Sequence, residues 1–148
     1  MAETVTLSKL LHVRENDRKE AQKVYHDALA FFEDIATQFY TLLRKKEGAE
    51  ESYDNSLQAT VPLEMIKEQI TYIEMLNKQI LELQEKVQHA RSEMEAKQLK
   101  LTDAHVEVKK YEKIIDTRIK SEEEVRAMRE KDSMDEISIR QFLSHKNR

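Results

Sequence analysis

The sequence predicts an all-α protein in which two long helices form an antiparallel coiled-coil hairpin with a short C-terminal helical segment. Three observations predict this class. The 148 residues include one glycine and one proline, the residues that turns most often require. Apolar residues recur with heptad spacing along two long stretches, and the main break between these stretches lies at residues 55–62. This pattern argues against a β-sandwich, a barrel or a βαβ enzyme.

The first helix is predicted at about 4–57. Its seam is apolar from Ala21 to Leu42 and interrupted by Arg14 and Arg18 nearer the N-terminus. Alternating steps of four and three residues define this seam. The seam positions are Leu7, Leu11, Arg14, Arg18, Ala21, Tyr25, Ala28, Phe32, Ile35, Phe39, Leu42, Lys46, Ala49 and Tyr53.

The turn is predicted at about 58–62. Pro62 suits the start of a helix, where its missing N–H is not needed, and the hydroxyl of Thr60 could cap that start. Glu64 follows, where a negative charge favours the positive end of the helix dipole. So short a connection makes the two helices antiparallel.

The second helix is predicted at about 63–131, and its heptad pattern is the more regular. One position is apolar in eight successive repeats: Ile66, Ile73, Ile80, Val87, Met94, Leu101, Val108 and Ile115. The other is apolar with one charged exception: Leu76, Leu83, Ala90, Lys97, Ala104 and Tyr111. This regularity predicts a seam for the first helix.

A short C-terminal segment at 133–144 completes the predicted hairpin, which is expected to form a single domain over 1–148. Ser133 with Glu136 resembles a capping box that would open a new helix. The polar residues 129–132 before it are predicted to form a hinge.

Composition and charge exclude several classes of function. The 25 basic and 29 acidic residues give a net charge of −4 and are spread along the chain, so no basic patch predicts nucleic-acid binding. No stretch reaches the ~20 apolar residues of a membrane span, and the N-terminus does not resemble a signal peptide. Absence of cysteine removes disulfides and thiol chemistry and fits a reducing, cytosolic compartment.

No catalytic, cofactor-binding or metal-ligating set is predicted, so the protein is expected not to be an enzyme. The five histidines are scattered, without pairs at i,i+3 or i,i+4, and no glycine-rich loop could hold a phosphate. Two sets of apolar residues are instead candidate anchors for a partner. Phe31 and Tyr40 lie off the seam, and the C-terminal segment carries Ile137, Ile139, Phe142 and Leu143.

The sequence also resembles the flagellar FliJ family over essentially its whole length. The most specific likeness is Met134 to Phe142, which matches the M-D-(D/E)-I-S-I-(K/R)-Q-F ending of Bacillus-type members. The stretch Val106–Lys113 in the second helix and the opening Leu7–Leu11 are similar to the family as well.

This resemblance implies a cytoplasmic, non-enzymatic part of the flagellar type III export apparatus, peripheral on the cell membrane at the flagellar base. FliJ proteins are similar in shape to the central stalk of rotary ATPases. They associate with the hexameric export ATPase FliI, with the export gate FlhA and with flagellar export chaperones. The resemblance thus implies these three partners and no cofactor.

The resemblance further implies a gate-binding face formed by Gln38, Leu42, Tyr72 and Leu76. Leu42 and Leu76 are also seam positions, so packing between the helices is an alternative role for both. The neighbouring Lys45, Ala49, Gln79 and Leu83 depart from the family pattern. The paired segments 7–32 and 101–125 are expected to contact the ATPase ring.

Two other interpretations remain open from the residues alone. One is a structural or holdase-type coiled-coil adaptor unrelated to export, although the polar turn at 55–60 offers little apolar surface for a client. The other is a regulator that self-associates through its seam.

Overall fold

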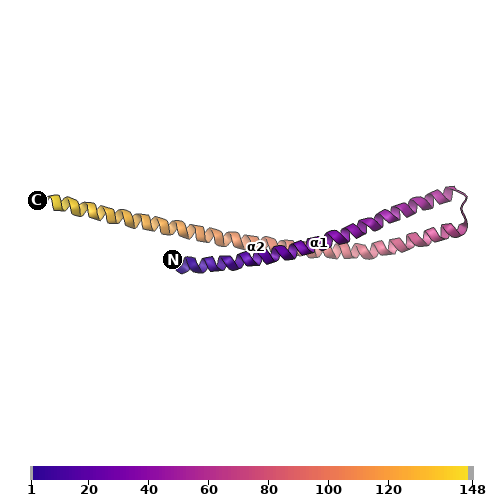
Figure 1. The fold of residues 1–148 in the computed structure, drawn as a ribbon, viewed down its shortest axis with the longest axis horizontal. Helices are drawn as coiled ribbons and strands as arrows, with labels where there is room; N and C mark the ends of the chain where they lie inside the picture. Colours follow the sequence, from indigo (N-terminus) through magenta and orange to yellow (C-terminus); the bar gives the residue numbers. More distant parts are fainter. Residues whose placement is uncertain (1, 147–148) are drawn as a thin grey trace. The chain divides into compact units, whose positions relative to one another are not determined.

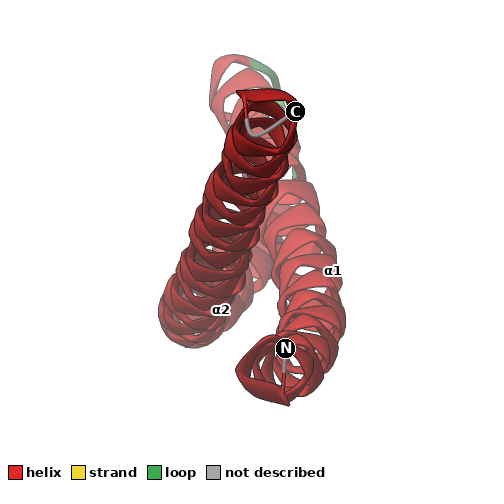
Figure 2. Ribbon diagram, turned by 90° about the vertical axis from the view of Figure 1, so that its left-hand side faces the viewer, coloured by secondary structure: helices red, strands yellow, loops and turns green. Residues whose placement is uncertain are grey.

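A computed structural model describes residues 2–146 as two long helices. Helix α1 spans Ala2–Gln58 and helix α2 spans Leu63–Lys146. The described chain contains no strand, and a four-residue connection at 59–62 is its one non-helical part (Figure 2). The all-α class and the helical hairpin are confirmed.

The chain divides into two compact units. One unit comprises Lys19–Thr102, and the other comprises the described residues of Met1–Arg18 and Asp103–Arg148. Parts of α1 and α2 pair in each unit. Whether the chain forms a single domain over 1–148 stays a prediction, and residues 1, 147 and 148 lie outside the described part.

The connection lies in the unit Lys19–Thr102, where α1 and α2 meet (Figure 1). Pro62 directly precedes α2, and its carbonyl oxygen accepts hydrogen bonds from the N–H groups of Met65, at 3.1 Å, and Ile66, at 3.4 Å. Because this residue need not donate a hydrogen bond, the missing N–H of proline costs nothing there. Thr60 makes no side-chain hydrogen bond within residues 2–146, so the expected hydroxyl cap is not formed.

The seam follows the predicted heptad positions. Each of the predicted seam residues is buried or partly buried, whereas the residues between them are mostly exposed. The most deeply buried side chains are Ile35, Leu76, Ile80, Ala90 and Val108. Heptad spacing therefore selected the contacting face of each helix correctly, because residues three and four apart share one side of a helix.

Specific cross-helix contacts define the register within the unit Lys19–Thr102. The Nε2 of Gln69 donates a hydrogen bond of 3.0 Å to the Oγ of Ser56 near the connection. Farther along, the guanidinium of Arg91 lies 5.6 Å from the centroid of the Phe32 ring. Residue numbers fall along α1 as they rise along α2, as an antiparallel pair requires.

The other unit has its own antiparallel contacts. Arg14 lies with its guanidinium 5.8 Å from the ring centroid of Tyr111. Arg118 forms an ion pair with Glu3, and the Oγ1 of Thr4 donates a hydrogen bond of 3.1 Å to Oε1 of Glu122. These contacts join residues 3–14 of α1 to residues 111–122 of α2.

The predicted hinge at 129–132 is wrong. Helix α2 continues through these residues to Lys146, so the C-terminal segment is helical as expected but is the end of α2. Arginine, glutamate and lysine at 129–131 are good helix formers, and neither glycine nor proline interrupts them. Ser133 lies inside the helix and therefore cannot act as its N-cap.

Candidate interaction surfaces

The described residues do not assemble a metal site or a membrane span. Within residues 2–146 no three histidine, aspartate or glutamate side chains lie close enough together to hold a metal ion. Neither α1 nor α2 contains a stretch that is both apolar and long enough to cross a membrane. The surface features that remain to be considered are grooves and exposed apolar side chains.

A groove with a volume of about 790 Å³, here called the acidic groove, lies between α1 and α2. It lies wholly in the unit Lys19–Thr102. Helix α1 contributes Phe31, Asp34, Ile35 and Gln38. Helix α2 contributes Glu82, Leu83, Glu85, Lys86 and His89.

The acidic groove combines an apolar floor with negative charge. Ile35 is buried and Leu83 is partly buried, whereas Phe31 is 58% exposed at the edge. Phe31 lies off the heptad seam, which explains why packing against α2 leaves most of its ring in water.

Three carboxylates, those of Asp34, Glu82 and Glu85, line the groove beside this floor. Asp34 accepts a hydrogen bond of 3.1 Å from the Nε2 of Gln38. Glu82 and Glu85 form no ion pair with any residue of the described chain, although Lys86 follows Glu82 by four residues. Three acids against one lysine leave the groove with a negative local charge.

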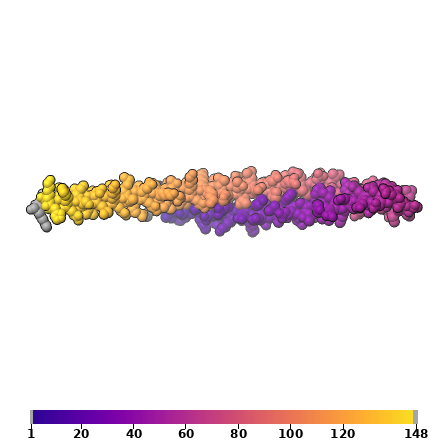
Figure 3. All heavy atoms as spheres, turned by 90° about the horizontal axis from the view of Figure 1, so that it is seen from above, coloured from indigo at the N-terminus to yellow at the C-terminus, as the bar shows by residue number. Residues whose placement is uncertain are grey.

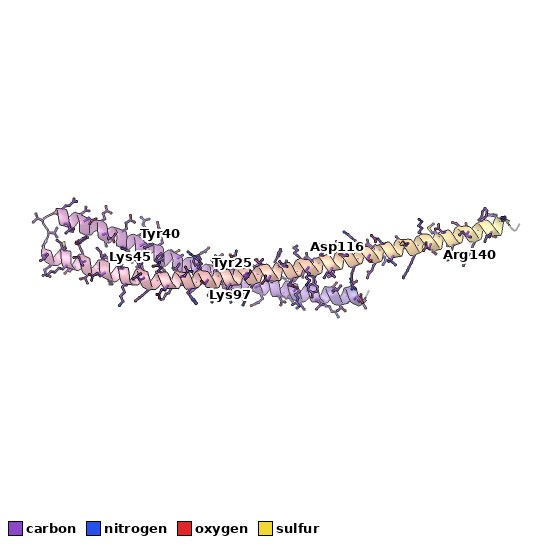
Figure 4. The ribbon with its side chains drawn as sticks, turned by 180° about the vertical axis from the view of Figure 1, so that it is seen from behind. Tyr25, Tyr40, Lys45, Lys97, Asp116 and Arg140 are labelled. Carbon is purple, nitrogen blue, oxygen red and sulfur yellow. The ribbon has the colours of Figure 1, made fainter. Side chains whose placement is uncertain are left out.

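A smaller groove of about 330 Å³ adjoins the acidic groove. Its lining comprises Thr37, Gln38, Thr41, Leu42, Lys45 and Leu83, so Gln38 and Leu83 belong to both grooves. Lys45, which lines this groove, and Tyr40 both lie on α1 (Figure 4). The Tyr40 hydroxyl accepts a hydrogen bond of 3.1 Å from Arg44.

The structure brings together two of the four residues of the expected gate-binding face. Gln38 and Leu42 line the same small groove. Tyr72 is exposed in a separate hollow of about 410 Å³ along α2, beside Thr71 and Met75. Leu76 is only 2% exposed, so its side chain contributes to the seam rather than to the surface.

Sequence reasoning did not identify the acidic groove. Phe31 was predicted only as an aromatic anchor off the seam, without acidic neighbours. The available signal was the position of Asp34, three residues after Phe31, which places a carboxylate and an aromatic ring on one side of α1. Its proximity to Glu82 and Glu85 required the register of the two helices.

The end of α2 is a second exposed surface. Apart from partly buried Glu122, residues 116–146 are exposed, and α2 extends beyond the N-terminal end of α1 in this unit (Figure 3). Its large exposed apolar side chains are Val125, Met128, Met134, Ile137, Ile139, Phe142 and Leu143. The candidate anchors expected at the C-terminus are therefore exposed.

Charge interrupts the seam of this same unit at Arg14. The guanidinium donates a hydrogen bond of 3.2 Å to Asp17, and this bond, together with the neighbouring Tyr111, raises the pKa of Arg14 above its usual value. The Nε of Arg14 is buried without a hydrogen-bond partner. A charged side chain at a seam position makes this part of the interface less apolar than the middle of the other unit.

Comparisons with known proteins give one consistent result. The sequence model of the family described as "Flagellar FliJ protein" matches residues 3–147. A curated flagellar FliJ protein of Bacillus subtilis (strain 168) is 30% identical over 146 residues, which cover 97% of each chain. No solved structure matches significantly.

Proposed function

The chain belongs to the flagellar FliJ family, whose members are components of the flagellar export apparatus, and we propose that it acts there as a non-enzymatic, stalk-like coiled coil. The observation that carries the proposal is the match along residues 3–147, together with a relative of nearly the same extent. The match includes both helices and the connection between them.

The proposed partners are the hexameric export ATPase FliI, the export gate FlhA and the flagellar export chaperones. The protein would work in the cytoplasm, peripherally on the cytoplasmic face of the cell membrane at the flagellar base. A paired helical surface supports this role because it offers long flanks to other proteins. Exposed ion pairs such as Lys120–Asp116, at 3.4 Å, contribute little stability to the fold. Exposed charges of this kind suit reversible contacts, because they guide how two proteins orient as they meet.

We assign different partners to different parts of the chain. The ATPase ring would contact residues 7–32 of α1 and residues 101–125 of α2. The gate would contact the surface around Gln38 and Leu42, with Tyr72 as an exposed aromatic contact. Leu76 would support this face from within the seam because its side chain is buried.

The first experiment is a binding assay with the purified full-length chain. Immobilised protein should retain the hexameric ATPase FliI and should not retain an unrelated hexameric ATPase ring. Equal retention of both rings, or of neither, would contradict the proposed partnership with the export ATPase.

A second experiment separates the gate contact from the ATPase contact. The variants Gln38→Ala and Tyr72→Ala should weaken retention of the cytoplasmic part of FlhA while leaving FliI binding unchanged. The matched control is Leu99→Ala, because Leu99 is an exposed large side chain outside the proposed gate-binding residues. Equal loss of gate binding in all three variants would argue against this particular face.

A third experiment examines the end of α2. A chain cut after Lys131 lacks the distal apolar residues but keeps the seam. Unchanged ATPase stimulation and unchanged gate binding would rule out a role for residues 132–148 in either contact.

A further inference from the structure

The acidic groove and the end of α2 have the features of a groove and of a helix that could bind in it. The groove has an apolar floor with three carboxylates and one lysine around it. The end of α2 presents exposed apolar side chains on an unpaired stretch of helix. Helix-in-groove recognition uses this combination, in which apolar anchors spaced by three and four residues enter an apolar groove.

The last two turns of α2 carry such anchors on one side. Ile139 is followed by Phe142 after three residues and by Leu143 after four, so their side chains share one helix face. Phe142 is 66% exposed, the largest fraction of these three. No residue of α1 covers this part of α2 in the unit that contains both.

Positive charge accompanies these anchors. Arg140 precedes Leu143 by three residues and Lys146 follows Phe142 by four, so both cations lie beside the apolar face. Residues 137–146 contain no aspartate or glutamate. Arg140 lies near the end of α2 (Figure 4) and is exposed.

We propose that the end of α2, at residues 139–146, docks in the acidic groove of a second copy of this chain. Phe142 and its apolar neighbours would cover the floor formed by Ile35 and Leu83. Arg140 and Lys146 would face Glu82 and Glu85, whose carboxylates have no ion-pair partner within residues 2–146. Opposite charges beside an apolar contact favour this arrangement over groove-to-groove pairing, which would bring like charges together.

This contact joins two different surfaces and is therefore heterologous. A heterologous contact does not by itself limit an assembly to two copies. Association should consequently appear as an average mass that rises with protein concentration, and it should weaken in high salt because the charges are exposed.

The test uses sedimentation of the full-length protein over a range of concentrations. The wild type should self-associate, whereas Arg140→Glu/Lys146→Glu and Glu82→Lys/Glu85→Lys should each weaken association by about tenfold or more. Mixing these two variants should restore association, because the reversed charges are again opposite. Circular dichroism of each variant should show that both remain helical.

Matched controls carry the same charge changes at other exposed positions of α2. Lys113→Glu/Lys131→Glu and Glu93→Lys/Glu95→Lys should both associate like the wild type. Phe142→Ala should weaken association, whereas Ile137→Ala should not. Ile137 lies two residues before Ile139, and residues two apart on a helix do not share a face.

Three results would overturn the proposal. The first is a wild type that sediments as a single chain at every concentration. This result is also the one expected if the end of α2 binds the groove of its own chain. The second is association that survives both charge reversals. The third is failure of the mixed, folded variants to associate again. Binding to FliI and FlhA is measured separately, so the proposed function does not depend on this outcome.

Discussion

At the scale of single residues, position in the seam determines what each side chain does. Leu76 and Leu81 are both leucines of α2, but Leu76 is 2% exposed and Leu81 is 65% exposed. The difference follows from the helical period, because a step of five residues places two side chains on different faces. The same side chain is therefore part of the seam at one position and of the surface at the other.

Replacement of Leu76 by alanine should lower the free energy of unfolding by about 2 kcal/mol or more, since it removes buried methyl and methylene groups and leaves a cavity. Leu81→Ala is the matched control and should change stability by less than about 0.5 kcal/mol. Urea unfolding followed by circular dichroism measures both values. Equal effects would show that the seam does not include Leu76.

The single glycine of the chain allows a second test at this scale. Gly48 lies inside α1, has no positive φ, and an added Cβ would meet no atom within 4 Å. Nothing in the fold therefore requires a glycine at this position.

We expect Gly48→Ala to stabilise the protein by about 0.5–1 kcal/mol, because alanine loses less backbone entropy when the helix forms. The same urea titration measures the change. Gly48→Pro provides the opposite control, with a loss of about 3 kcal/mol from a missing hydrogen bond and a steric clash. A destabilised alanine variant would contradict the structure around Gly48.

At the scale of helices, α2 differs along its length. Its earlier part packs on α1, whereas all described residues after Glu122 are exposed. A lone helical stretch of this kind depends on intrinsic propensity and on continuation from a packed helix, since isolated helices are marginal in water. The end of α2 should consequently contribute helicity without contributing to the stability of the paired part.

Removal of residues 132–148 should therefore leave the thermal midpoint of the remaining chain within about 2 °C of the full-length value. Circular dichroism at a helical wavelength measures the midpoint and the loss of signal from the removed turns. Removal of residues 2–18 is the comparison, because that segment contains the contacts of Arg14, Thr4 and Glu3. It should lower the midpoint more, and equal effects would contradict the described pairing.

At the scale of the molecule, the short connection determines the antiparallel direction, and the seam supplies the stability. The connection has four residues, 59–62. One hydrogen bond, from Gln69 to Ser56, joins side chains of the two helices beside it. The connection itself thus contributes few contacts.

Insertion of four glycine and serine residues between Ala59 and Thr60 should cost only about 0.6 kcal/mol, the loop-closure cost of doubling the loop length. Urea unfolding again provides the measurement. An insertion within the exposed end of α2, after Lys131, controls for added length. A loss of several kcal/mol from the loop insertion alone would mean that the connection has a specific structural role.

The sequence was sufficient for features that depend on local chemistry and periodicity. Scarcity of glycine and proline indicated long helices, heptad spacing identified the contacting faces, and Pro62 located the start of α2. The hinge at 129–132 was wrong because polarity was taken as a break, whereas good helix formers continue a helix unless glycine or proline interrupts them.

Features that depend on which residues of α1 meet which residues of α2 came only from the tertiary structure. The acidic groove joins Asp34 to Glu82 and Glu85 across the pair, and Leu76 proved to be buried while Tyr72 remained exposed. Heptad spacing specifies a face but not the register between two faces, because many offsets bring apolar rows together. The seam and the class of fold were thus determined by the sequence alone, whereas the grooves and their charge were decided by the register that packing selects.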